Sequence, residues 1–241
     1  MSDSDVVIKR TKSPVEVVGE FVGSSVGAKV IMAVTGLGLW GFVIAHMLGN
    51  LQVFQGPEPL NAYGHFLQHE LLHGAGVWAM RAGLLTITAL HIAFGLRLAA
   101  KNRAARPVQY AKKKTMRTNP ASLSMAVTGL VVLGFIVFHI LHYTVGVVVP
   151  VDYALEDAKG RHDVFEMVWR GFHTPWIVAI YVIGQVVVLS HLTHGTVSLW
   201  QSLGWHHPVW TPVLRVVGRG LAVLIFAGNL GIVFAVWSWT R

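Results

Sequence analysis

The chain has 241 residues, of which 54% are hydrophobic and only 12% are charged, and its formal net charge is +8. With a mean hydropathy of +0.56 it is too apolar for an ordinary soluble domain of this length. The absence of cysteine excludes disulfides, iron-sulfur clusters and thiolate ligands within the chain. Its positive charges are not interleaved with aromatic residues, so we expect no nucleic-acid partner.

Five apolar stretches are long enough to cross a hydrocarbon core of roughly 30 Å, which takes about 20 helical residues. They lie near residues 30–54, 77–100, 123–149, 176–203 and 213–239. We therefore predict an all-α, polytopic membrane protein, a bundle of five transmembrane helices that forms one membrane domain over residues 1–241. Residues 1–28 are predicted to be a cytoplasmic segment without a cleavable signal, and residues 15–26 to lie along the membrane interface.

The distribution of Lys and Arg predicts the orientation. If the N-terminus is cytoplasmic, most of these residues fall on the cytoplasmic side. The remaining five are Arg81, Lys159, Arg161, Arg170 and Arg241. The positive-inside rule then gives an N-in, C-out topology, in which the net positive charge faces the cytoplasm and the membrane surface.

The first and third stretches carry an internal repeat. Residues 32–48 (MAVTGLGLWGFVIAHML) and residues 125–141 (MAVTGLVVLGFIVFHIL) agree without a gap at ten positions. Each copy holds one histidine near its far end, His46 in the first and His139 in the third. Such self-similarity predicts a duplicated structural unit.

The second and fourth stretches continue the repeat more faintly. Residues 91–95 and 191–195 each begin with a histidine and end with a glycine. The duplicated unit is therefore predicted to be a helix pair with one histidine on each helix, namely His91 in the second stretch and His191 in the fourth.

Helical rise places the four histidines at two depths. His46 and His139, the outer pair, fall near the outer face, whereas His91 and His191, the inner pair, fall nearer the cytoplasm. The two levels are separated by roughly 15 Å at 1.5 Å per residue. A haem iron in an electron-transfer cytochrome takes an axial base on each side, and neutral imidazole supplies one without burying a net side-chain charge. We therefore predict two haem b groups, each with its iron bound by one pair.

Five further residues are candidates for contacts around these haems. His142 and His194 follow His139 and His191 by three residues, but the repeat has no histidine at the matching positions of its other copies. We interpret both as supporting or propionate-side groups. Lys29, Arg81 and Arg97 are predicted to neutralise haem propionates. A copper or zinc site is disfavoured, since no stretch offers a central carboxylate or thiolate.

Residues 69–73 fit the HExxH pattern of zinc proteases, with Glu70 as the general base and His65 one turn earlier. This alternative leaves the order of the other histidines unexplained. A second interpretation is an amphipathic surface helix that caps the outer end of the bundle. In a third, Glu70 borders a quinone pocket beside the outer haem and exchanges protons during quinone redox chemistry.

The histidine pattern and several longer motifs resemble a known family, the cytochrome b subunits of bacterial succinate dehydrogenases and fumarate reductases. The members in question have one five-helix anchor and two haems (b-558 type). The residues that carry the resemblance are GAKVIMAVTG at 27–36, FVIAH at 42–46, GNL at 49–51, NAY at 61–63, ARPVQY at 105–110 and HLTHGTVSLWQSLG at 191–204. Together these motifs span nearly the whole chain.

The resemblance implies ligation of the distal haem by His46 and His139 and of the proximal haem by His91 and His191. It also implies a flavoprotein subunit with covalent FAD and the dicarboxylate site, an iron-sulfur subunit, and menaquinone as the usual acceptor. The chain would then be the quinone-reactive anchor of respiratory complex II, an enzyme of the tricarboxylic acid cycle, in the bacterial cytoplasmic (inner) membrane.

One departure from the family bears on direction. Related fumarate reductases place a glutamate two residues before the fourth ligand, where this chain has Leu189. This difference favours a physiological succinate dehydrogenase over a fumarate reductase. The alternative from another class is the cytochrome b subunit of a hydrogenase or formate dehydrogenase.

Overall fold

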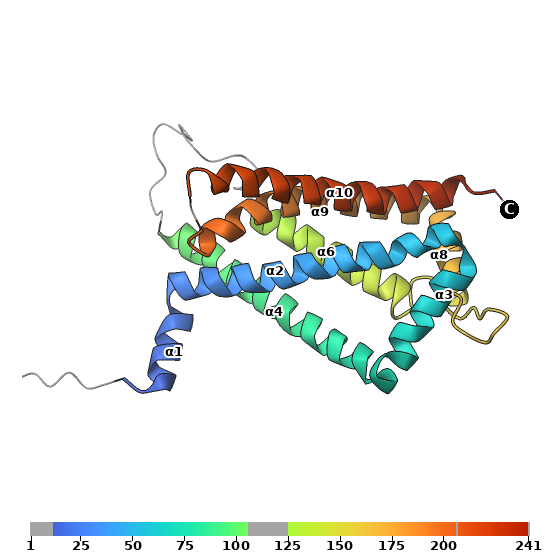
Figure 1. Ribbon diagram of the computed structural model, residues 1–241, viewed down its shortest axis with the longest axis horizontal. Coiled ribbons are helices and arrows are strands. Elements are labelled where there is room, and N and C mark those ends of the chain that lie inside the picture. The colour runs from blue at the N-terminus through green and yellow to red at the C-terminus, as the bar shows by residue number, and fades with distance from the viewer. Residues whose placement is uncertain (1–11, 106–124, 206, 241) are drawn as a thin grey trace, which may run out of the picture.

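In the computed structural model, which describes residues 12–105, 125–205 and 207–240, every regular element of these ranges is helical. Five helices are long and apolar enough to cross a membrane: α2 (Ser25–Asn50), α4 (Ala75–Ala104), α6 (Met125–Tyr143), α9 (Pro175–Ser202) and α10 (Trp210–Ser238). Helices α2, α6 and α10 run in one direction along the long axis, and α4 and α9 run in the other (Figure 1). The expected all-α chain with five membrane-length helices is confirmed.

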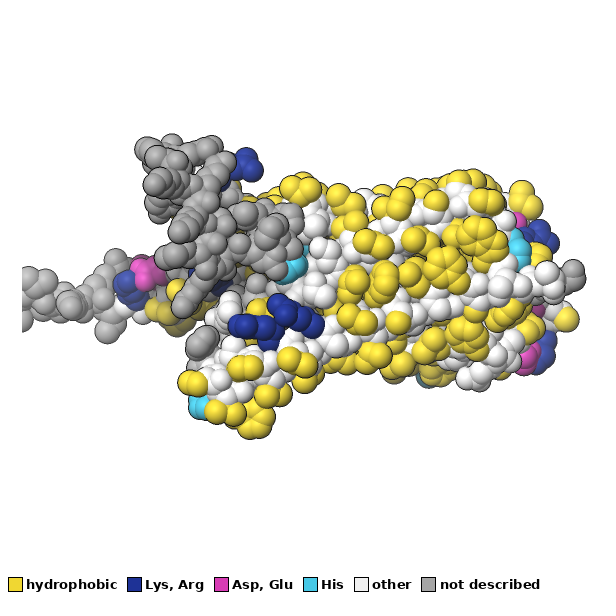
Figure 2. All heavy atoms as spheres, turned by 90° about the horizontal axis from the view of Figure 1, so that it is seen from above, with side chains coloured by type: hydrophobic (Ala, Val, Ile, Leu, Met, Phe, Trp, Pro, Cys, Tyr) yellow, Lys and Arg dark blue, Asp and Glu magenta, His cyan; other side chains and the backbone are white. Residues whose placement is uncertain are grey.

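Hydrophobic side chains cover the middle of the molecule, while the coloured charged side chains gather toward its two ends (Figure 2). Several of these hydrophobic side chains are large and more than half exposed, such as Leu85, Ile183 and Leu224. A soluble protein avoids such a continuous apolar surface, whereas a bilayer covers it. The surface therefore suits a multi-pass membrane protein.

The ends of α2, α4, α9 and α10 lie within five residues of the predicted ones, and the largest difference is at the end of the third span. Helix α6 ends at Tyr143, six residues before the predicted end at Val149. The chain turns at Gly146, whose φ of 75° is left-handed, and a Cβ there would collide with the ring of Tyr153. Hydropathy continues through this turn, so the apolar pattern extended the prediction too far. The predicted start at residue 123 and the basic stretch 106–117 lie outside the described residues.

A short helix, α1 (Pro14–Gly23), stands across the bundle at the end where α2 begins (Figure 1). Ser24 forms the corner, and its hydroxyl caps the first turn of α2. The guanidinium of Arg97 donates hydrogen bonds to the carbonyls of Val22 and Gly23 and so ties α4 to this corner. We call this the α1 end of the bundle.

The opposite end, which we call the α3 end, is built from short helices between the long ones. They are η1 (Leu51–Gln55), α3 (Pro57–His65), η2 (Phe66–Glu70), η3 (Leu71–Gly74), α7 (Pro150–Tyr153) and α8 (Val164–Phe172). A hydrophobic core joins several of them to α9 and α10, with Val53, Leu60, Phe172, Ile177 and Val236 among its buried members. The α3 end is therefore a packed cap.

A buried amide holds this cap together. Asn61 is 1% exposed; its amide nitrogen donates to Asp163 Oδ1 at 3.0 Å, and its oxygen accepts from the backbone N–H of Phe165 at 2.9 Å. The same nitrogen lies 3.4 Å from Asp157, whose carboxylate is paired with Arg161. We call Asn61, Asp157, Arg161 and Asp163 the cap clasp, because they fasten α3 to the loop before α8.

Candidate functional site

The inner pair is assembled from α4 and α9. The ring centroids of His91 and His191 are 6.5 Å apart, with the ring planes at 74°. The Nδ1 of His91 lies 3.3 Å from the hydroxyl of Thr35, and the Nδ1 of His191 lies 3.3 Å from that of Thr128. Helices α2 and α6 thus each position one imidazole that belongs to a neighbouring helix.

The two halves of the inner pair are built by equivalent residues. Thr35 and Thr128 occupy the same position of the repeat, as do the glycines that follow them. A Cβ at Gly36 would lie 3.1 Å from Cε1 of His91, and one at Gly129 would lie 3.4 Å from Cε1 of His191. A side chain at Gly36 would press on the ring of His91, whereas at Gly129 a Cβ would make an ordinary contact with the ring of His191.

The hydrogen bonds of these threonines determine the tautomer of the inner imidazoles. Each hydroxyl already donates to a carbonyl of its own helix, from Thr35 to Ile31 at 2.7 Å and from Thr128 to Met125 at 3.1 Å. A hydroxyl has a single hydrogen, so its oxygen must accept from the histidine. Nδ1 therefore carries the proton, and Nε2 of the neutral ring is left with a lone pair for a metal.

The outer pair is assembled from α2 and α6. The ring centroids of His46 and His139 are 5.7 Å apart, with the planes at 87°, and Phe42 stacks on His46. The Nδ1 of His139 lies 3.0 Å from the hydroxyl of Tyr181, a buried residue of α9. The equivalent histidines of the repeat thus meet each other across the bundle.

The two pairs lie at different levels of the bundle. The inner pair contacts Gly36 and Gly129, each of which precedes the outer-pair histidine of its own helix by ten residues. At 1.5 Å per residue this spacing corresponds to roughly 15 Å along the axis.

The separation of the rings in both pairs is the one that two imidazoles on opposite sides of one metal ion would have. Imidazole nitrogens bind transition metals at about 2 Å, so two rings on opposite sides of one ion have centroids about 6 Å apart. The observed separations of 5.7 Å and 6.5 Å fall on either side of that value.

The predicted supporting residues have different surroundings. His142 is 3% exposed and lies 3.2 Å from the hydroxyl of Tyr181, which also contacts His139. His194 is half-buried, one turn after His191 in α9. The structure therefore connects His142 with the outer pair through Tyr181.

The three predicted propionate partners lie at both ends of the bundle. Arg97 binds backbone carbonyls at the α1 end, and Lys29 is exposed at that end. Arg81 lies near the α3 end, with its guanidinium carbon 4.9 Å from the ring centroid of Trp78. Arg97 thus has a structural role that the sequence analysis did not anticipate.

The HExxH motif does not lie on a regular α-helix. The π-helical turn η2 ends at Glu70, and Leu72 and His73 have left-handed φ values of 50° and 53°. Zinc proteases need both histidines on one helical face, and this break separates His69 from His73. Among the described residues no group of three or more His, Asp or Glu side chains is arranged to hold a metal ion. The expectation of a continuous surface helix at this position is wrong.

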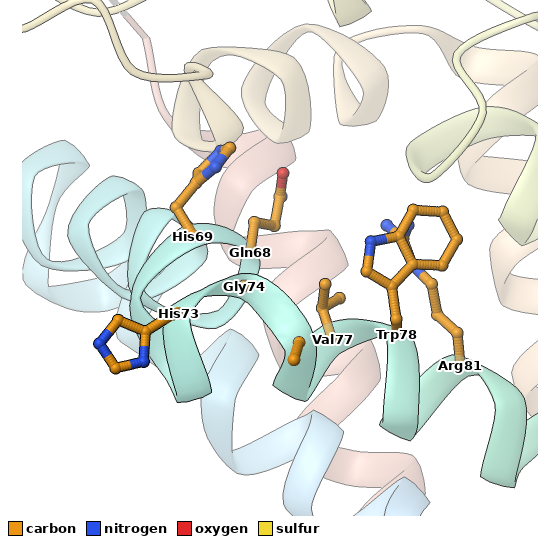
Figure 3. A pocket seen from close by; sticks show the side chains of 8 residues that line it. Gln68, His69, His73, Gly74, Val77, Trp78 and Arg81 are labelled. Atoms are coloured by element: carbon orange, nitrogen blue, oxygen red, sulfur yellow. The ribbon is translucent and has the colours of Figure 1, made fainter.

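A pocket opens beside this break, with a volume of about 500 Å³. It is lined by Gln68, His69, His73, Gly74, Ala75, Val77, Trp78 and Arg81, and Figure 3 shows most of these side chains around it. Glu70 is not a lining residue, because its carboxylate lies 3.1 Å from Nδ1 of His65 instead. The pocket is thus lined by neighbours of Glu70 and not by Glu70 itself, which was expected to border a pocket.

Sequence reasoning missed Thr35, Thr128 and Tyr181 as partners of the histidines. The threonines contact the inner pair, whose histidines belong to neighbouring helices. Their recurrence at one position of the repeat was the available signal. Comparison with protein-family models, curated proteins and solved structures finds no match to this chain.

Proposed function

We propose that the chain is the di-haem cytochrome b anchor of a succinate:quinone oxidoreductase, and that it passes electrons between an iron-sulfur subunit and a quinone. The observation that carries the proposal is the pairing of His46 with His139 and of His91 with His191 at two levels of one bundle. The equivalent threonine and glycine contacts around the inner pair are what an internal two-helix repeat would produce.

The two levels suit electron transfer across a membrane. Haem b, when bound at both pairs, would supply one-electron redox capacity at each level. The chain's own contribution is to place four imidazoles within an apolar bundle, three of them with a hydrogen-bond partner at Nδ1. The roughly 15 Å between levels gives two stations that lie within one membrane thickness.

In this proposal the α1 end faces the cytoplasm. Lys29, Lys101 and Arg103 lie there, in accordance with the positive-inside rule. An iron-sulfur subunit would dock at this end, next to the inner pair, and a flavoprotein with FAD would hold the dicarboxylate site. The membrane would be the bacterial cytoplasmic membrane, with the chain in an N-in, C-out orientation.

The pocket at the α3 end is the proposed quinone site. Its volume of about 500 Å³ lies in the usual range for small-molecule sites. Reduction of a quinone such as menaquinone consumes protons as well as electrons, and the lining imidazoles of His69 and His73 can exchange them. In this proposal Glu70 lies outside the lining of the pocket and acts through the contact of its carboxylate with His65.

The proposal is tested by purifying the native complex and identifying what accompanies the chain. We expect a subunit with flavin and one with iron-sulfur clusters, and we expect succinate to reduce the haems in the absence of other donors. Partners that carry nickel or molybdenum would instead identify the cytochrome of a hydrogenase or formate dehydrogenase and would overturn the assignment.

A further inference from the structure

The hydroxyl of Tyr181 contacts two imidazoles. It lies 3.0 Å from Nδ1 of His139 and 3.2 Å from Nδ1 of His142. Tyr181 is 5% exposed and His142 is 3% exposed, so within the protein these groups depend on one another for hydrogen bonds. His142 also stacks on Tyr143, with ring centroids 3.9 Å apart, which fixes its orientation.

The donors and acceptors of this trio can be arranged in only one way if His139 binds a metal. Ligation through Nε2 requires the proton of the neutral ring to sit on Nδ1, so His139 donates to the tyrosine oxygen. The single hydrogen of the hydroxyl then points to His142, whose Nδ1 must accept. A directed chain runs from His139 through Tyr181 to His142.

The inner pair has no comparable chain. Thr35 and Thr128 pass their hydrogen to carbonyls of their own helices. The Nδ1 of His91 also lies 3.2 Å from the carbonyl oxygen of Met32, so beyond the threonine hydroxyls the inner imidazoles reach only backbone groups. In the outer pair, none of the described residues hydrogen-bonds the ring of His46. His139 is therefore the one outer ligand whose second nitrogen is held by the protein.

We propose that Tyr181 is a positioning residue that, through His139, sets the reduction potential of the outer haem. This inference rests on the proposed function. Donation of its own hydrogen to His142 makes the tyrosine oxygen a stronger acceptor, because hydrogen bonds in a chain polarise one another. The stronger acceptor raises the basicity of His139, and a more basic ligand favours the oxidised iron. The chain thus lowers the potential of the outer haem.

The test is a redox titration of the Tyr181→Phe variant in the intact complex. Phenylalanine keeps the ring that packs against Phe135 and Phe172 and removes only the hydroxyl. We expect the outer haem's midpoint potential to rise by about 59 mV, a tenfold change in a one-electron equilibrium, with the inner haem unchanged. The His91→Ala variant shows which potential belongs to which haem, because this variant should lose the inner haem and keep the outer one.

Thr128→Val is the matched control, because it removes the acceptor of His191 and should raise only the inner potential. If Tyr181→Phe leaves the outer potential unchanged, or moves the inner one, the inference is overturned. If the Tyr181→Phe variant loses the outer haem, the titration is made on His142→Phe instead. A smaller rise of the outer haem's midpoint potential in that variant supports the hydrogen-bond chain, and an unchanged potential overturns it. A wild-type protein without haem would refute the proposed function itself.

Discussion

At the scale of single residues, the two histidine pairs differ in the side chain that contacts Nδ1 of the ring. The inner rings are held by Thr35 and Thr128, while His139 is held by a tyrosine. A ring with Nδ1 occupied presents Nε2 to a metal in one tautomer and one orientation. These contacts therefore orient three of the four rings.

Replacing His191 with alanine should remove the inner haem and retain the outer one, because the two levels are roughly 15 Å apart. The haem content per chain, measured as the pyridine haemochrome, should fall by about half. His194→Ala, one turn further along α9, is the matched control and should retain both haems. Retention of both haems in His191→Ala would refute this ligand assignment.

The sequence was sufficient to pair the four histidines and insufficient to identify what holds them. Pairing follows from the repeat and from helical rise, which are regular over a whole span. The contacts of Thr35, Thr128 and Tyr181 depend on how neighbouring helices rotate against one another, and no pattern along a single helix encodes that rotation. Only the recurrence of threonine in both copies gave a hint.

At the scale of elements, the cap clasp fastens the α3 end. Asn61 makes its hydrogen bonds in a fully buried position and joins α3 to the segment that begins α8. Loss of its side chain would leave Asp163 and the N–H of Phe165 without that partner. The link between α3 and the start of α8 would then be weakened, while the hydrophobic core of the cap would remain.

Asn61→Ala should destabilise the detergent-solubilised protein by about 1–3 kcal/mol, the cost of buried groups left without a hydrogen bond. The measurement is the thermal unfolding midpoint. Lys159→Ala provides the control, because its ion pair with Glu58 is more than half exposed and should contribute less than about 1 kcal/mol. Equal midpoints for Asn61→Ala and the wild type would contradict the role of the clasp.

The ion pair of Asp157 with Arg161 is expected to stabilise the same cap in a pH-dependent way. Its hydrogen bond from Arg161 holds the pKa of the Asp157 carboxyl well below its usual value. A lowered folded pKa gives stability that is present above the unfolded pKa of about 4 and is lost as the pH falls through the folded value. The midpoint difference between wild type and Asp157→Asn should therefore narrow below about pH 4. A difference that stays constant with pH would exclude this mechanism.

Helix positions were predictable from hydropathy, but the irregular segments were not. The apolar run past Tyr143 gave no sign of the turn at Gly146, and the HExxH spacing suggested a helix where Leu72 and His73 are left-handed. In both places local backbone geometry is set by packing, since glycines at 74, 76 and 146 allow turns or close approaches. Periodicity alone carries no such information.

At the scale of the whole molecule, the proposed function requires a defined orientation of the chain in the membrane. The alternating directions of the five long helices put the start of α2 and the end of α10 at opposite ends (Figure 1). The positive-inside rule then assigns the α1 end to the cytoplasm. The quinone pocket and the cap would face the other side.

Because the chain has no cysteine, single cysteines can report this topology. Lys159→Cys and Thr240→Cys should react with a membrane-impermeant maleimide in intact spheroplasts. Ser13→Cys should react only after permeabilisation. The reverse pattern would contradict the N-in, C-out orientation and with it the docking of soluble subunits at the α1 end.

Two histidine pairs that hold two haems in one bundle would give the purified chain a dithionite-reduced spectrum with the α-band of haem b. We expect this spectrum to correspond to two haems per chain. A colourless protein, or one that binds a single haem with all four histidines intact, would contradict it.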